Sequence, residues 1–375
     1  MRSLFNRHSS PQSLSEDEVR AVLRTVIEPD LHRDLVSLGM VRDISIDKRG
    51  NVTLTLELST PAHPLKARLA SDCRDAIRSL EGAGEVTVKF TANVAADERI
   101  AKQLGMPIRN VIAIASGKGG VGKSTMSSNL AIALAQEGAR VGLMDADLYG
   151  PNIPQMMGAG ELPPPRNQRM ITTEAHGVKL MSMGFLVPPD QPVIWRGPML
   201  HSALRQFLSD VDWGELDYLL IDMPPGTGDV QMSLAQSVPI TGSVLVSTPQ
   251  SVALSDVRKG AMAFRTLEVP LLGLIENMSY FVAPDTGKRY DIFGHGGGQR
   301  YAREIDIPFL GQVPLDPRIV TGGDTGEPIV VAQPESDAAR AIRAAAREVA
   351  AQVSVLNLTR IPEGVIGAMD IPIMG

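Results

Sequence analysis

The sequence predicts an α/β protein in which a small α/β domain precedes a larger domain built on a mostly parallel sheet covered by helices. Two observations support this prediction. From Asn110 onward, strand-like apolar runs alternate with helical patterns, which is the order expected of an open parallel sheet. Between the first of these runs and the first helix lies a glycine-rich segment, GKGGVGKST at 117–125. A loop of this composition between a strand and a helix is typical of a phosphate-binding domain.

Residues 13–95 are expected to form the small domain. Ser15 and Glu18 have the spacing of a capping box, and the apolar residues that follow them recur on one helical face up to a stop near Pro29. Alternating apolar and polar residues at 52–58 then predict a half-buried strand. The further predicted elements are a helix at 65–80 and a strand at 86–90.

The larger domain is expected at 110–355. Residues 96–109 are polar and contain Gly and Pro, so they predict a linker, and 356–375 predict a C-terminal tail. An alanine-rich and arginine-rich pattern at 338–353 predicts a closing helix. After the first strand at 111–115, strands are predicted at 140–144, 179–183, 218–222, 243–247, 271–275 and 309–312.

Composition limits the classes of partner. The chain has 375 residues, a net charge of −6 and a pI near 5.6, and it has no basic stripe for nucleic acid. No apolar run approaches the length of a membrane span, so we expect no membrane partner and a cytoplasmic protein. The single cysteine, Cys73, excludes a disulfide within the chain and any metal site made only of cysteines from one chain.

The segment 117–125 satisfies the pattern GxxxxGK[ST]. Backbone N–H groups of such a loop and the N-terminus of the following helix, predicted at 126–137, point at phosphate oxygens. Lys123 would neutralise the β- and γ-phosphates, Ser124 would hold Mg²⁺, and Thr125 would lie near the α-phosphate. We therefore predict ATP and Mg²⁺ as cofactors and ATP hydrolysis as the activity. The predicted nucleotide-binding residues of the loop are Gly117, Lys118, Gly119, Gly120, Val121, Gly122, Lys123, Ser124 and Thr125.

Polar residues at later strand ends complete the predicted site. Asp145 ends an apolar strand and would orient the attacking water, and Asp147, two residues on, would point the same way and sense the γ-phosphate or else cap a helix. Asp222 ends another strand and would hold Mg²⁺ through water. Asn277 follows a third strand, where its side-chain amide could pair with adenine. The segment 314–317 could cover the base.

Several motifs resemble one known family. Lys118, an early second lysine, resembles the deviant Walker A ATPases, in which that lysine reaches the nucleotide of the partner subunit. Across its length the chain contains the motifs IASGKGGVGKST, DADLYGPNIP, WRGPM, DWGELDYLLIDMPPGTGD, TPQ, ENMSYF and DIFGHGGG. With this full set of motifs the chain resembles the Mrp/ApbC family of iron-sulfur cluster carriers, and segments 34–46 and 58–66 resemble the small domain of iron-sulfur assembly factors.

This resemblance implies a homodimeric ATPase, with Lys118, Lys123 and Asp145 as catalytic residues, that passes iron-sulfur clusters to apoproteins together with assembly factors. It also implies a Cys-x-x-Cys pair shortly after ENMSYF. Ala283 and Thr286 stand there instead and cannot supply thiolates.

The cluster ligands are therefore unknown from the sequence. Cys73, His63 and His295 are weak candidates, since Cys73 lies in a helical pattern, His63 is expected to be an exposed loop residue, and His295 fits a turn. Two functions remain open. One is an ATP-dependent cluster carrier that uses other ligands, transient binding or a partner protein, and the other is a nucleotide-switched regulatory or scaffold dimer that holds no cluster.

Overall fold

The computed structural model describes residues 14–147, 150–185, 206–226, 231–232, 235–236 and 238–360. The chain divides into two compact units, one comprising residues up to Val94 with the segment from Val355 onward, and the other running from Ala95 to Ser354. Each unit has its own hydrophobic core. No helix of the described ranges is both long enough and apolar enough to cross a bilayer.

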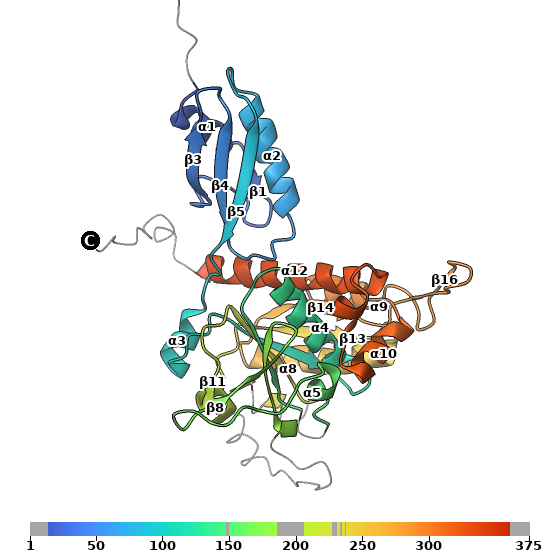
Figure 1. Ribbon diagram of the computed structural model, residues 1–375. Helices are drawn as coiled ribbons and strands as arrows, with labels where there is room; N and C mark the ends of the chain where they lie inside the picture. Colours follow the sequence, from blue (N-terminus) through green and yellow to red (C-terminus); the bar gives the residue numbers. More distant parts are fainter. Residues whose placement is uncertain are drawn as a thin grey trace, which may run out of the picture. The chain divides into compact units, whose positions relative to one another are not determined.

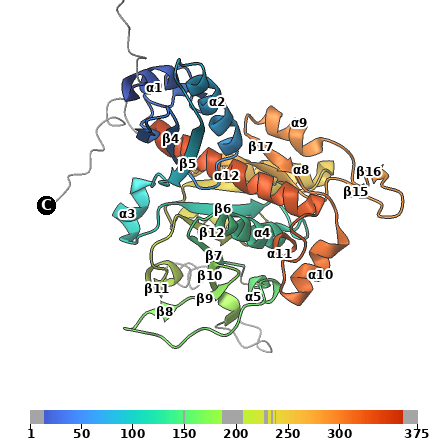
Figure 2. The same ribbon diagram turned by 45° about the horizontal axis from the view of Figure 1, so that its top comes forward.

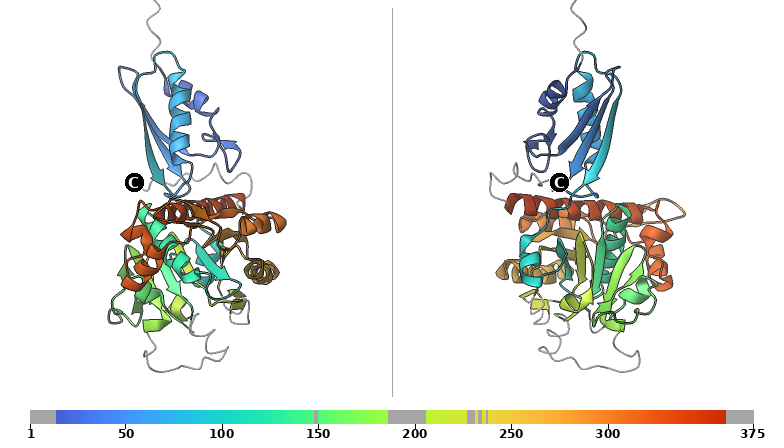
Figure 3. Two further views of the ribbon diagram at one scale, coloured as in Figure 1. Left: turned by 90° about the vertical axis from the view of Figure 1, so that its right-hand side faces the viewer. Right: turned by 60° about the vertical axis from the view of Figure 1, so that its left-hand side comes forward.

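The small unit is a three-stranded sheet with helices α1 and α2, of which α2 lies along one face of the sheet (Figures 1 and 3). Strand β4 alternates buried and half-buried residues, as its sequence predicts, and it pairs antiparallel with β3 and parallel with β5. The elements are α1 (Glu16–Leu23), β1 (Ile27–Glu28), β2 (Arg33–Asp34), β3 (Val41–Ile46), β4 (Val52–Leu58), α2 (Lys66–Arg78) and β5 (Val86–Ala92).

The first helix is shorter than expected. The capping box is formed, because Glu18 N donates to Ser15 Oγ and Ser15 N donates to Glu18 Oε2. The helix nevertheless ends at Leu23 instead of near Pro29, and β1 follows it. The β-branched run at 25–27 favours an extended chain, and the residue before a proline avoids the helical region.

The larger unit is built on a sheet in which, among the described residues, eight strands follow the order β17-β14-β13-β6-β12-β7-β10-β9. All neighbours pair in parallel except β9 and β10, and Figure 2 shows β6, β12, β7, β10 and β9 in this succession. The mostly parallel sheet agrees with the prediction. The strands are β6 (Val111–Ser116), β7 (Val141–Asp145), β9 (Thr173–Ala175), β10 (Val178–Ser182), β12 (Tyr218–Asp222), β13 (Gly242–Ser247), β14 (Leu271–Glu276) and β17 (Phe309–Gln312).

Helices cover this sheet: α4 packs against β6, β12 and β7, α8 against β6, β13 and β14, and α9 against β14 and β17. Both faces of the central strands are buried, which explains their continuous apolar sequences. The helices are α3 (Glu98–Leu104), α4 (Lys123–Gln136), α5 (Ile153–Met156), the 3₁₀ turn η1 (Met183–Phe185), α8 (Ser251–Thr266), α9 (Gly297–Glu304), α10 (Pro317–Thr325), α11 (Ile329–Ala332) and α12 (Asp337–Arg360). Two short strand pairs join β8 (Met170–Ile171) to β11 (Val211–Asp212) and β15 (Phe281–Val282) to β16 (Arg289–Tyr290).

Two expected boundaries differ from the observed elements. The polar segment 96–109, expected to be a linker, contains α3, which Asp97 caps and whose Ile100 is fully buried in the core of the larger unit. The closing helix, expected at 338–353, is α12 and continues to Arg360. The next residue that cannot continue a helix is Pro362, so nothing in the sequence requires the earlier end.

Candidate functional site

The glycine-rich loop joins β6 to the N-terminus of α4, as its sequence predicts. Gly122 has φ +83°, and a Cβ there would lie 2.2 Å from Asn277 Nδ2. A Cβ on Gly117 would lie 2.3 Å from the carbonyl carbon of Asp256 in α8. These two positions therefore require glycine. Around Gly119 and Gly120, in contrast, a Cβ would meet nothing within 4 Å, so a ligand can approach the backbone there.

Asp222 is the centre of a buried polar cluster beside this loop. Lys123 Nζ lies 2.7 Å from Asp222 Oδ2, and Ser124 Oγ donates to the same oxygen at 2.6 Å. Ser127 Oγ donates to Asp222 Oδ1 at 2.6 Å. The fold thus brings together the two residues expected to hold Mg²⁺ and the lysine expected to contact phosphate. A hydroxyl and a carboxylate beside open backbone N–H groups suit a Mg²⁺-nucleotide.

Asp145 ends β7 directly opposite Asp222 on β12, and it is fully buried. Its Oδ2 accepts a hydrogen bond from Ser182 Oγ at 2.8 Å, and its Oδ1 accepts one from Asp147 N at 3.1 Å. Burial, and secondly the charge of Asp222, raise the pKa of Asp145 to about 7. Asp145 is therefore held by protein groups on both oxygens.

Asp147 has a different environment from Asp145, although the two carboxylates were expected to face the same place. Asp147 Oδ2 lies 3.9 Å from Lys123 Nζ. The chain turns after β7, so that the N–H of Asp147 bonds back to the Asp145 side chain. Asp147 forms a long ion pair with Lys123 of the loop.

A cavity of about 390 Å³ adjoins the end of the loop, and this volume is within the range of small-molecule sites. Asn277 lines it, but its Nδ2 donates to Val121 O at 2.9 Å, so the amide nitrogen holds the loop. The segment expected to cover a base does line this cavity. The lining residues are Gly122, Thr125, Asn152, Gln155, Met156, Asn277, Met278, Pro314, Leu315, Asp316, Ile319, Val320, Gly323 and Asp324.

Lys118 lies half-buried near the tip of the loop, where its backbone carbonyl accepts a hydrogen bond from Ser116 Oγ at 3.0 Å. No carboxylate of the described residues forms an ion pair with its ammonium group. Lys118 and Lys123 therefore differ, since Lys123 is engaged inside the site.

Three further buried polar residues were not predicted. Ser127 lies one helical turn after Ser124, and Ser182 ends β10 beside β7, so each is visible in the sequence only once the strand order is known. Glu276 precedes Asn277, is fully buried, and accepts hydrogen bonds from Ser279 Oγ, Gly298 N and Gln312 Nε2 at 2.5, 2.5 and 2.9 Å. Glu276 thus fixes the strand end that carries Asn277.

Some predicted motifs lie outside the described residues. These are WRGPM at 195–199, positions 148–149 of the motif after β7, and positions 227–229 of the motif DWGELDYLLIDMPPGTGD at 212–229. Gly226 is described, has φ +95° and donates its N–H to Ser116 O. This glycine conformation is what a tight turn beside the loop requires.

The position expected to carry a cysteine pair is the turn between β15 and β16. Ala283 N donates to Lys288 O at 3.0 Å and Gly287 N donates to Ala283 O at 2.8 Å, which closes the turn. Ala283 is half-buried and Thr286 is exposed. Neither offers a soft ligand for iron.

The other candidate cluster ligands also have defined surroundings. Cys73 is fully buried in α2, and burial raises the pKa of its thiol to about 12, so it is a packed thiol and not a thiolate. His295 is exposed, 3.6 Å from Asp291. His63 was expected to be exposed, and this was wrong: its side chain is 5% exposed and its Nε2 lies 3.6 Å from Glu28 Oε1. The strand pair β1 and β2, which the sequence did not predict, provides Glu28.

Comparisons with known proteins agree with this architecture. Residues 107–350 match the family model of the NUBPL iron-transfer P-loop NTPases, and residues 16–90 match that of the iron-sulfur cluster assembly proteins. The chain is 50% identical over 352 residues to an iron-sulfur cluster carrier protein of Synechocystis, covering 92% of this chain and 99% of that one. It is also 50% identical over 351 residues to an iron-sulfur cluster carrier protein of Deinococcus radiodurans, and this match covers 92% of this chain and 98% of the relative.

A solved structure is similar to about two thirds of this chain. It is the nucleotide-binding protein of Archaeoglobus fulgidus in complex with ADP, which is 37% identical to this chain. The match covers 65% of this chain and 95% of the Archaeoglobus chain, with a TM-score of 0.54. The match of more than half of the chain to the NTPase model, together with near full-length relatives at 50% identity, shows the family. The chain belongs to the NUBPL-type iron-transfer P-loop NTPases, among the iron-sulfur cluster carrier proteins.

Proposed function

We propose that this chain hydrolyses ATP to ADP and phosphate and carries iron-sulfur clusters to apoproteins. The observation that carries the proposal is the convergence of Lys123, Ser124 and Asp222 beside the glycine loop, in a chain half identical to cluster carrier proteins. The ADP bound by the Archaeoglobus relative supports an adenine nucleotide. The relatives' name supports the cargo, and apoproteins and assembly factors are the partners it implies.

The loop residues 117–125 would hold the phosphates, Ser124 and Asp222 would hold Mg²⁺, and the cavity lined by Asn277 would receive the base. Bound Mg²⁺ would supply charge neutralisation at the phosphates. Lys123 adds a positive charge at the same place. Asp145 was expected to orient the attacking water, but both of its oxygens already accept hydrogen bonds from protein groups. We therefore propose that Asp147, 3.9 Å from Lys123, orients the water, and that Asp145 positions Asp147 by accepting a hydrogen bond from its N–H.

We further propose that the active form is a homodimer in which Lys118 reaches the nucleotide of the other subunit. Lys118 lies near the loop tip and has no ion pair with a described carboxylate, in contrast to the engaged Lys123. A free cation at the tip of a phosphate loop can add a charge-assisted contact to a phosphate across a symmetric interface.

The cluster is bound differently from a thiolate pair in the β15–β16 turn, because Ala283 and Thr286 occupy those positions. We propose that the cluster is held by other ligands, transiently, or jointly with a partner protein. The only thiol of the chain, Cys73, is buried with a raised pKa, so it is not proposed as a ligand.

Anaerobic reconstitution with iron and sulfide tests the cargo. We expect an iron-sulfur absorption band during reconstitution and transfer of activity to an apoprotein that needs a cluster, with Cys73→Ala behaving like the unmodified chain. Absence of both a chromophore and transfer, in protein that still hydrolyses ATP, would favour a nucleotide-switched scaffold instead. Absence of ATP hydrolysis in the same preparation would contradict the enzymatic half of the proposal.

A further inference from the structure

Glu28, at the end of β1 in the small unit, is a buried carboxylate with one oxygen that accepts no hydrogen bond from the described residues and is in an ion pair with His63. Its residue is 1% exposed. Oε2 accepts a hydrogen bond from Leu31 N at 2.6 Å, whereas Oε1 is buried and has no hydrogen-bond partner among the described residues. An unsatisfied buried carboxylate oxygen costs free energy unless something else satisfies it.

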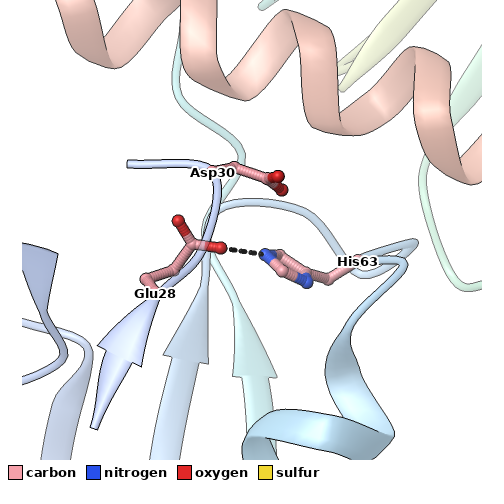
Figure 4. Close-up of side chains that lie close together, drawn as sticks. All are labelled: Glu28, Asp30 and His63. Carbon is pink, nitrogen blue, oxygen red and sulfur yellow. Dashed lines mark ion pairs between the residues drawn. The ribbon is translucent and has the colours of Figure 1, made fainter. Parts of the chain in front are cut away.

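This oxygen points at His63, from the loop between β4 and α2. His63 Nε2 lies 3.6 Å from Glu28 Oε1, which is too long for a hydrogen bond. Asp30, two residues after Glu28, brings a third side chain, and one ligand atom from each of the three lies within 4.8 Å of the others. Figure 4 shows the three side chains turned toward one another, with Asp30 and Glu28 on neighbouring positions of one segment and His63 opposite.

We propose that Glu28, Asp30 and His63 bind a divalent first-row transition metal ion such as Zn²⁺ or Fe²⁺ in the small unit. One imidazole nitrogen and two carboxylate oxygens are a donor set that such ions accept, whereas Mg²⁺ and Ca²⁺ prefer oxygen alone. Three protein ligands leave at least one position for water or an incoming group. Asp30 is exposed, so the ion can enter from solvent on its side.

The donor set also separates this site from an iron-sulfur cluster, which is held by thiolates. Cys73 lies elsewhere, inside the hydrophobic core of the small unit. The proposed site therefore holds a single ion, and it goes beyond the proposed ATPase and carrier function because it uses none of the residues of the glycine loop.

Metal binding has one structural cost. His63 Nδ1 accepts a hydrogen bond from Leu65 N at 3.2 Å, so the imidazole proton of the neutral ring lies on Nε2. If Nε2 binds the metal, this proton moves to Nδ1, and Nδ1 can then no longer accept the hydrogen bond from Leu65 N. The loss of one neutral hydrogen bond is small beside the binding of a metal through three ligands.

Titration of the full chain with Co²⁺ alone, after chelator treatment and without nucleotide, tests the proposal through the visible absorption of bound Co²⁺. We expect one ion per chain, displaced by Zn²⁺. Glu28→Gln and His63→Gln should each weaken binding by about 10-fold or more, since even outer-shell changes cost 10-fold to 100-fold. Asp30→Asn should weaken it also, and because Asp30 is exposed this variant should fold normally.

His295→Gln is the matched control, because His295 Nδ1 also lies 3.6 Å from a carboxylate, that of Asp291, but on an exposed surface. It should bind Co²⁺ as the unmodified chain does. Thermal unfolding without metal should show that each variant is folded. Absence of stoichiometric Co²⁺ binding by the unmodified chain would overturn the proposal. Unchanged affinity of folded Glu28→Gln, His63→Gln and Asp30→Asn, or loss of the ion in His295→Gln, would overturn it as well.

Discussion

Asp145 and Asp222 lie directly opposite one another at the ends of the neighbouring parallel strands β7 and β12, and both are fully buried. Two carboxylates in this arrangement disfavour simultaneous ionisation. Asp222 has Lys123 and two serine hydroxyls as partners, whereas the pKa of Asp145 is raised to about 7, first by burial and then by the charge of Asp222. This asymmetry gives the site one firmly partnered carboxylate and one that titrates near neutrality.

The first prediction concerns pH and stability. A carboxyl group with a raised folded pKa stabilises the protein fully below its unfolded value, about 3.9, and this contribution is lost as the pH rises through about 7. Asp145→Asn cannot ionise, so its free energy of unfolding relative to the unmodified chain should increase as the pH rises from 4 to above 7. Urea unfolding at several pH values, without Mg²⁺ or nucleotide, measures this. If the difference in unfolding free energy between Asp145→Asn and the unmodified chain did not change with pH, the raised pKa of Asp145 would be contradicted.

The second prediction concerns hydrolysis. Lys123→Ala should lower ATP turnover by roughly 100-fold, because one charged transition-state contact contributes about 3 kcal/mol. Lys259→Ala is the control, since its Nζ is exposed on α8 and, within the described ranges, its ion-pair partner is Asp256 on the same helix. Steady-state phosphate release from highly purified protein measures the turnover of both variants. Equal turnover in Lys123→Ala and Lys259→Ala would show that Lys123 does not belong to the ATPase site.

The third prediction separates action within one subunit from action across the dimer. Lys118→Ala should lower hydrolysis while leaving nucleotide binding to the monomer largely intact. Mixing it with Lys123→Ala protein should restore part of the activity, because the mixed dimer would contain one complete site. If mixing restores nothing although subunits exchange, or if Lys118→Ala abolishes binding, Lys118 acts within its own subunit.

The fourth prediction compares two glycines of the loop. Gly122→Ala should destabilise the fold, since φ is +83° and the added Cβ would lie 2.2 Å from Asn277 Nδ2. Gly119→Ala should leave the melting temperature nearly unchanged, because a Cβ there meets nothing within 4 Å, but it should weaken nucleotide binding by narrowing the approach to the backbone. Thermal unfolding and nucleotide titration of the same two proteins check both statements. Equal melting temperatures would contradict the first.

The fifth prediction restores the missing ligands. The double variant Ala283→Cys with Thr286→Cys should retain a reconstituted cluster through desalting better than the unmodified chain does. The β15–β16 turn would then carry two thiolates, one at the half-buried position 283 and one at the exposed position 286. Ala283→Ser with Thr286→Ser is the matched control, since it adds hydroxyl groups without a soft ligand. Equal retention of iron and sulfide by the two double variants would show that two thiolates placed in this turn do not hold a cluster.

The sequence by itself determined the main architecture of the larger unit. The buried runs that became β6, β7, β12, β13, β14 and β17 were visible because parallel strands covered on both faces need continuous apolar residues. The glycine pattern fixed the position of the loop before α4. Strand alternation and the capping box likewise predicted β4 and α1, although the end of α1 depended on weaker, local preferences.

Only the tertiary structure decided which side chains meet. Strand order placed β12 between β6 and β7, and this set Asp222 beside Lys123 and opposite Asp145. It also brought the Asp147 carboxylate to 3.9 Å from the ammonium group of Lys123. The strand β1 was not predicted, and it places Glu28 beside His63 in the interior. The sequence had suggested that His63 is exposed, whereas the structure buries it. Burial and contacts between distant segments depend on how the chain packs, and no local pattern of residues records them.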